Sequence, residues 1–172
     1  PGLYAENNLN GAVNILNAMA KTGVKVLVFS SSAAVYGMPE YLPVDEKHPL
    51  NPISFYGFTK QETERLMVWY DRLKGIRYTA LRYFNAAGYD ASGAGKGRDS
   101  NPQNLLPIIK EVVDGKRECL QVFGDDYDTR DGTCVRDYVH VSDLAAAHVL
   151  AIKRLLEGRP SAIFNLGTSH GV

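Results

Sequence analysis

A tyrosine and a lysine stand four positions apart in the stretch SFYGFTK, as Tyr56 and Lys60. Residues four apart on a helix share one face, so the lysine ammonium can lie beside the tyrosine hydroxyl. A free tyrosine has a pKa of about 10 and is a weak base at neutral pH, but a neighbouring cation favours the phenolate and lowers that pKa. The pair therefore predicts a tyrosine that acts as a general base.

The spacing alone is weak evidence, because Tyr70 and Lys74 repeat it. Position separates the two pairs. The apolar run KVLVFSSS (25–32) predicts a buried parallel strand, and the next helix should begin near Tyr56, at the sheet edge where ligands bind. Tyr70 follows 14 residues later, which is roughly 21 Å along the helix axis. Only the first pair is expected to reach a ligand.

Three serines, Ser30, Ser31 and Ser32, end the strand that precedes this helix. A single serine at such a place usually does no more than cap a strand end. Three together at the edge where Tyr56 and Lys60 begin their helix favour a role in the site. We expect their hydroxyls to face the pair and to bond a substrate and the tyrosine.

Hydrophobic periodicity and turn residues place the remaining elements. Helices are expected over 3–20, 56–73, 105–115 and 142–158, the last capped by Ser142 or Asp143. Buried strands are expected over 25–32, 76–84 and 162–167, short strands over 120–124 and 135–141, and a loop over 86–103. The order of strand, crossover helix and strand is typical of one α/β domain.

Composition narrows the classes of function. The chain has 172 residues, is 45% hydrophobic, and balances 19 Lys and Arg with 19 Asp and Glu, so no basic field for nucleic acid is expected. Its two cysteines and four histidines lack metal-site spacing, so no metal is predicted. No apolar run suits a membrane helix. These features favour a soluble cytoplasmic protein that binds a small ligand.

The chain begins at Pro1 within a helical pattern and ends at Val172, just after a strand. We therefore expect it to be a fragment of a longer protein.

Four stretches of the chain together resemble the extended short-chain dehydrogenase/reductase family, and within it the UDP-sugar 4-epimerases. These stretches are FSSSAAVYG, YGFTK, LRYFNAAG and GTCVRDYVHVSDLAAAH. The similarity runs from about Tyr4 to the end, and DGTCVRDYVHV is its most specific part. It implies an α/β fold: part of a Rossmann-type doubly wound parallel sheet, with part of a smaller substrate-binding lobe. Residues 1–85 would be the C-terminal half of the NAD-binding Rossmann domain. Residues 86–172 would mix substrate-lobe segments with a returning helix and strand.

The resemblance also implies roles, position by position. Tyr56 matches the base, Lys60 the residue that lowers its pKa and bonds the nicotinamide ribose, and Ser32 the residue that bonds the sugar 4-hydroxyl. The expected NAD contacts are Asn7, Ser30, Ser32, Tyr56, Lys60, Tyr83 and Phe84. Contacts to the UDP-sugar substrate are expected from Ser32, Tyr56, Asn85, Asn104, Leu105, Phe123 and Arg136; a guanidinium at Arg136 suits a diphosphate.

The implied reaction interconverts UDP-glucose and UDP-galactose through transient oxidation at C4 by tightly held NAD. The glycine-rich dinucleotide turn of the family is absent from this sequence. We therefore expect the 172 residues alone to bind NAD poorly and to be inactive. UDP-pentoses and UDP-N-acetylhexosamines are alternative substrates. The resemblance also implies a homodimer, with Met67, Trp69 and Tyr70 as candidates for its apolar face.

Two rivals share the fold. Nucleotide-sugar dehydratases carry acidic residues where this chain has Ala33 and Ala34, and the decarboxylases carry a glutamate at the Ala34 position. Alanines move no protons. A catalytically silent NAD-binding sensor typically loses the tyrosine or the lysine, and both are present here. These observations favour the epimerase.

Overall fold

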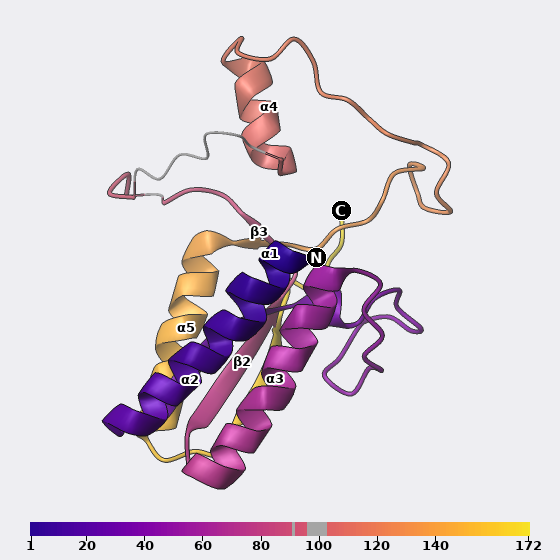
Figure 1. The fold of residues 1–172 in the computed structure, drawn as a ribbon. Coiled ribbons are helices and arrows are strands. Elements are labelled where there is room, and N and C mark those ends of the chain that lie inside the picture. The colour runs from indigo at the N-terminus through magenta and orange to yellow at the C-terminus, as the bar shows by residue number, and fades with distance from the viewer. Residues whose placement is uncertain (91, 96–102) are drawn as a thin grey trace.

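The computed structural model describes residues 1–90, 92–95 and 103–172. Its main layer is a parallel sheet in the order β1 (Val26–Ser32), β2 (Arg77–Tyr83) and β5 (Ala162–Leu166). Helices α2 (Gly11–Thr22) and α3 (Phe55–Lys74) lie on one face and α5 (Val141–Leu156) on the other, as Figure 1 shows. This arrangement confirms the predicted fold class, part of a Rossmann-type parallel sheet.

The limits of α3 follow from its end residues. The Ser54 side chain accepts a hydrogen bond from the backbone N–H of Gly57 at 3.0 Å, which caps the first turn. Gly75 ends the helix with a φ of 63°, a left-handed conformation that glycine adopts without strain. The predicted helix over 56–73 is thus confirmed and extended by one residue at each end.

The first helical segment is less regular than its sequence predicts. α1 (Gly2–Tyr4) runs into a π-helix, η1 (Ala5–Asn10), before α2 begins. Short π-helical turns occur often at functional sites. This one contains Asn7, which the resemblance assigns to the cofactor.

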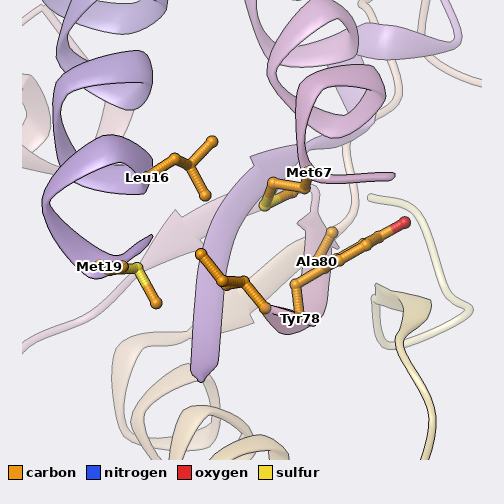
Figure 2. Close-up of a cluster of buried hydrophobic side chains, with 6 residues drawn as sticks. Leu16, Met19, Met67, Tyr78 and Ala80 are labelled. Atoms are coloured by element: carbon orange, nitrogen blue, oxygen red, sulfur yellow. The ribbon is translucent and has the colours of Figure 1, made fainter. Parts of the chain in front are cut away.

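The core lies between α2, α3 and the sheet, as Figure 2 shows. Its buried members are Leu16, Met19, Met67, Ile76, Tyr78 and Ala80. Met67 therefore packs in the core and is excluded as a candidate for an exposed apolar face. Tyr70 is half-buried and donates a hydrogen bond to Asn17 at 2.7 Å, whereas Trp69 is 57% exposed.

A second, smaller sheet pairs β3 (Asn85–Ala87) with β4 (Tyr138–His140) in parallel. β3 lies in the segment predicted as a loop, of which residues 91 and 96–102 are outside the described part. The expected strand over 120–124 is wrong: residues 120–123 are exposed, and none of the five pairs with a described strand. The expected strand over 135–141 shortens to β4, and the cap of α5 is His140, whose ring accepts from the backbone N–H of Ser142.

Helix α4 (Leu105–Val113) stands apart from the main sheet in Figure 1. Pro107 lies in its first turn, where a missing N–H costs no helical hydrogen bond. The helix confirms the first nine residues of the predicted segment 105–115.

The described residues contain neither a membrane-spanning helix nor a cluster of metal ligands. None of their helices is long and apolar enough to cross a membrane. Within the same ranges, no three His, Cys, Asp or Glu side chains gather as metal ligands. Cys119 and Cys134 are both free and exposed.

One core hydroxyl yields a stability prediction. Thr79 on β2 is buried, and its Oγ1 has no hydrogen-bond partner among the residues that the structure describes. We expect Thr79→Val to raise the free energy of unfolding by about 1 kcal/mol, because valine keeps the shape and removes an unpaired polar group. The control is Thr63→Val, since the Thr63 hydroxyl bonds the Thr59 carbonyl at 2.9 Å. A melting temperature of the Thr79→Val variant below that of the wild type would contradict the prediction.

Candidate active site

The predicted tyrosine lies at the carboxyl edge of the sheet. Tyr56 is in the first turn of α3, and Ser32 is the last residue of β1. Gly57 lets the two elements approach: a Cβ on this residue would lie 2.3 Å from the Ala34 carbonyl oxygen. A side chain there would push the start of α3, and Tyr56 with it, away from the end of β1.

Lys60 reaches the same edge from the next turn of α3. Its Nζ donates a hydrogen bond to the Ser30 carbonyl at 3.0 Å and lies 5.5 Å from the centre of the Tyr56 ring. The ammonium also lies 5.0 Å from the centre of the Phe29 ring. Burial lowers the pKa of Lys60. The helical spacing thus brings tyrosine and lysine together as predicted.

The surroundings of the Tyr56 phenol disfavour its ionised form, since its pKa is raised above the ordinary value for tyrosine. Burial raises its pKa, and a hydrogen bond with Ser32 opposes that rise without cancelling it. Tyr83 and Tyr4 add to the rise, and the Tyr4 ring centre is 5.9 Å from that of Tyr56. The lowering of the Tyr56 pKa by Lys60 therefore stays a prediction.

Ser32 gives this balance a direct test. Because its hydrogen bond lowers the pKa of Tyr56, we expect Ser32→Ala to raise that pKa further. The measurement is a pH titration of the Tyr56 ring by carbon-13 NMR, with the signal assigned by its loss in Tyr56→Phe. An unchanged midpoint would show that Ser32 does not bond the phenol. Ser92→Ala is a control at an exposed hydroxyl.

The three serines do not share one role. Ser32 faces Tyr56, and its Oγ also accepts from the backbone N–H of Ala34 at 3.2 Å. Ser30 Oγ lies 3.0 Å from His148 Nε2 on α5, across the sheet. Ser31 is fully buried and donates to Glu64 at 2.5 Å. The expectation that all three hydroxyls face the pair is wrong, because the adjacent Ser30 and Ser31 point to opposite faces of the sheet, toward α5 and α3 respectively.

A buried ion pair beneath the site escaped the sequence analysis. Arg82 on β2 and Glu64 on α3 are each 3% exposed, and they form two hydrogen bonds, of 2.9 and 2.6 Å. One signal was available: Arg82 interrupts the apolar run of its strand, and charged residues are rarely buried unless paired. His148 was also not predicted to contact the site, and no motif in the sequence marks it as a site residue.

A cavity of about 230 Å³ opens between the N-terminal helices, β1 and α3. Its polar lining includes Asn7, Asn8 and Lys60, and its apolar lining includes Leu27 and Phe29. Asn8 also donates to the Thr59 hydroxyl at 2.9 Å, and Thr59 donates to the Tyr56 carbonyl at 2.8 Å. The π-helical segment is thereby tied to the turn that carries the tyrosine.

Other predicted residues line the neighbouring strand ends. Tyr83 ends β2, Phe84 follows it, and Asn85 opens β3, where its side chain donates to the Asp137 carbonyl at 3.0 Å. Arg136 is next to Asp137, and its backbone exchanges hydrogen bonds of 2.8 and 2.9 Å with Val172. The guanidinium of Arg136 is exposed.

The structure does not bring three further predicted residues to this edge. Asn104 precedes α4, Leu105 is its first residue, and Phe123 is 94% exposed. Phe123 lines a separate hollow of about 320 Å³ with Ile108 and Leu120. Figure 1 shows this part of the chain away from the Tyr56 end of α3.

The sequence matches the model of the NAD dependent epimerase/dehydratase family over residues 1–167. The chain belongs to this family. The assignment confirms the resemblance seen in the sequence. Among curated members, the UDP-glucose 4-epimerase of Lactobacillus helveticus is 51% identical over 173 aligned positions, which cover 99% of this chain and 52% of that protein. The human UDP-glucose 4-epimerase is 47% identical, with 98% and 49% covered.

Solved structures of the family match the fold closely. The UDP-glucose 4-epimerase of Brucella ovis in complex with NAD superposes with a TM-score of 0.97 at 44% identity, over 100% of this chain and 53% of that one. The enzyme from Stenotrophomonas maltophila, with bound NAD and formylated UDP-arabinopyranose, gives 0.94 at 44% identity, over 100% and 52%. The chain spans about half the length of the relatives it matches.

Proposed function

We propose that this chain is part of a UDP-glucose 4-epimerase, an isomerase that interconverts UDP-glucose and UDP-galactose with NAD as cofactor. One observation carries the proposal: Tyr56, Lys60 and Ser32 meet at one edge of the sheet. Identity of 51% to a UDP-glucose 4-epimerase over 99% of the chain supports it.

Each side chain has a defined task in this proposal. Tyr56 takes the proton of the sugar 4-hydroxyl and later returns it. Since burial raises the pKa of Tyr56, a phenolate at neutral pH needs positive charge beside it, and the Lys60 ammonium lies over the ring. Ser32 orients the 4-hydroxyl against the phenol.

The residues present fit a dinucleotide cofactor. The cavity beside Lys60 combines amide and ammonium donors with apolar side chains, the mixture typical of cofactor pockets. The residues that would hold NAD are Asn7, Ser30, Ser32, Tyr56, Lys60, Tyr83 and Phe84. When bound, NAD would supply the oxidation at C4 and its reversal. The cavity is small for a whole dinucleotide, so the rest of the protein must complete the site.

A second group of residues would hold the UDP part of the substrate. We propose that this group consists of Asn85, Asn104, Leu105, Phe123 and Arg136. The exposed guanidinium of Arg136 suits a diphosphate. Because Asn104, Leu105 and Phe123 lie apart from Tyr56, we infer that the substrate bridges the two regions.

Related substrates form the second candidate. A relative of 44% identity has been solved with formylated UDP-arabinopyranose, which favours UDP-pentoses as the alternative. UDP-N-acetylhexosamines and a silent NAD-binding sensor remain weaker candidates, the sensor because Tyr56 and Lys60 are both in place. The domain limits of 1–85 and 86–172, the homodimer and the cytoplasmic location stay predictions.

The decisive experiment is conversion of UDP-galactose to UDP-glucose by the full-length protein that carries this chain, without added NAD. Rapid interconversion is expected, together with NAD released on denaturation. UDP-arabinose and UDP-N-acetylglucosamine are assayed in parallel. A protein that retains NAD and converts none of these sugars would contradict the proposal and favour the sensor.

A further inference from the structure

We propose that the buried pair of Glu64 and Arg82 is a positioning device that fixes Ser32 against Tyr56 by anchoring the chain on both sides of Ser32. This inference rests on the proposed function. It names Ser31, Glu64, Arg82 and Tyr36 as positioning residues for the same site, although none of them has been placed among its contacts.

The ion pair is supported from three elements. Glu64 lies one helical turn after Lys60 on α3, and Arg82 lies on β2. Sheet register places Ser31 of β1 and Asn165 of β5 on either side of Arg82. Their side chains form a polar row across the sheet, directly beneath the edge that carries Ser32.

Both neighbours of the Ser32 segment are attached to this pair. On one side, the Ser31 hydroxyl donates to Glu64 Oε1 at 2.5 Å. On the other, Arg82 Nη1 donates to the Tyr36 hydroxyl at 3.0 Å, and that hydroxyl donates to Asn165 Oδ1 at 2.6 Å. Ser31 and Tyr36 bracket residues 32–35, so one ion pair holds both ends of the turn.

The same pair also fixes the helix that carries the base. Glu64 accepts from Arg82 through both carboxylate oxygens, which restrains the rotation and translation of α3. Tyr56 and Lys60 precede Glu64 by eight and four residues on this helix. Ser32 and Tyr56 are therefore held from one common point.

The electrostatics agree with a permanently charged anchor. Burial by itself lowers the pKa of Arg82, but its hydrogen bonds with Glu64 and Tyr36 raise it on balance. Burial raises the pKa of Tyr36, so its hydroxyl stays protonated and can donate to Asn165. The Tyr36 hydroxyl thus accepts from Arg82 and donates to Asn165.

The test uses two variants that each remove one anchoring hydroxyl and keep the ion pair, Ser31→Ala and Tyr36→Phe, in the full-length protein. Misplacement of reacting groups by a fraction of an ångström lowers the rate of the chemical step, so we expect kcat to fall about 10-fold. KM for UDP-galactose should change less than twofold. The pKa of Tyr56, titrated by carbon-13 NMR, should rise in the direction expected for Ser32→Ala.

Two matched controls separate positioning from stability. Thr79→Val removes a buried hydroxyl from the same sheet that bonds none of the described residues. Glu62→Gln alters the partly exposed partner of Arg65 on α3, two residues before Glu64. Neither control should change kcat or the Tyr56 pKa.

The outcomes distinguish this inference from the proposed function. If both anchor variants melt at lower temperature but keep wild-type kcat and Tyr56 pKa, the pair only supports the fold and the inference is overturned. If the wild type converts no UDP-sugar, the proposed function fails. In that case the Tyr56 titration still decides: a raised pKa in both variants supports the anchor, and an unchanged pKa refutes it.

Discussion

Tyr56→Phe is expected to lower kcat for UDP-galactose by about 10²–10⁴-fold, the usual contribution of a positioned general base. Phenylalanine keeps the ring that lies against Tyr4 and under the Lys60 ammonium, and it removes only the oxygen proposed to accept the proton. Bound NAD and melting temperature should stay close to wild type. The measurement is steady-state conversion by the full-length protein, with NAD content determined after denaturation.

The chain supplies a matched control for this substitution. Tyr70 lies on the same helix with Lys74 four residues later, but among the described residues its hydroxyl bonds only Asn17. Tyr70→Phe should therefore leave kcat unchanged. Tyr56→Phe activity within a few-fold of wild type would remove Tyr56 as the base, and equal losses in both variants would point to a general effect on α3.

Arg82→Met is expected to cost about 3–5 kcal/mol of unfolding free energy, because it leaves the Glu64 carboxylate buried without its partner. Glu64 and Arg82 are each 3% exposed, so water cannot replace the lost contact without local opening. Urea denaturation followed by circular dichroism measures the change. Arg65→Met is the control, since Arg65 pairs with Glu62 at the surface, where such pairs contribute about 0–1 kcal/mol.

The double variant Glu64→Leu with Arg82→Met refines this prediction. Replacing both charges by apolar side chains of similar size removes the unpaired charge, so most of the lost stability should return. A double variant as unstable as Arg82→Met would show that the hydrogen bonds to Ser31 and Tyr36, and not the charge, carry the cost.

The sequence by itself determined the three strands of the main sheet and the proximity of Tyr56 to Lys60. Tyr56 and Lys60 lie four residues apart on a helix that the sequence predicts, so their common face follows from helical geometry alone. The apolar runs at 25–32, 76–84 and 162–167 are long enough to identify the parallel strands β1, β2 and β5. Local patterns of this kind need no knowledge of distant contacts.

Only the tertiary structure decided which partners Ser30, Ser31 and Ser32 contact. It also decided that an ion pair of Glu64 and Arg82 is buried beneath the site. Ser31 reaches Glu64 33 residues away, Ser30 reaches His148 118 residues away, and Tyr36 reaches Asn165 129 residues away. These partners are set by strand register and by which helix covers each face of the sheet. The missing strand at 120–124 has the same cause, because a strand forms only where a neighbour accepts its hydrogen bonds. Local sequence determines the backbone conformation of a residue, but long-range packing determines which side chain it contacts.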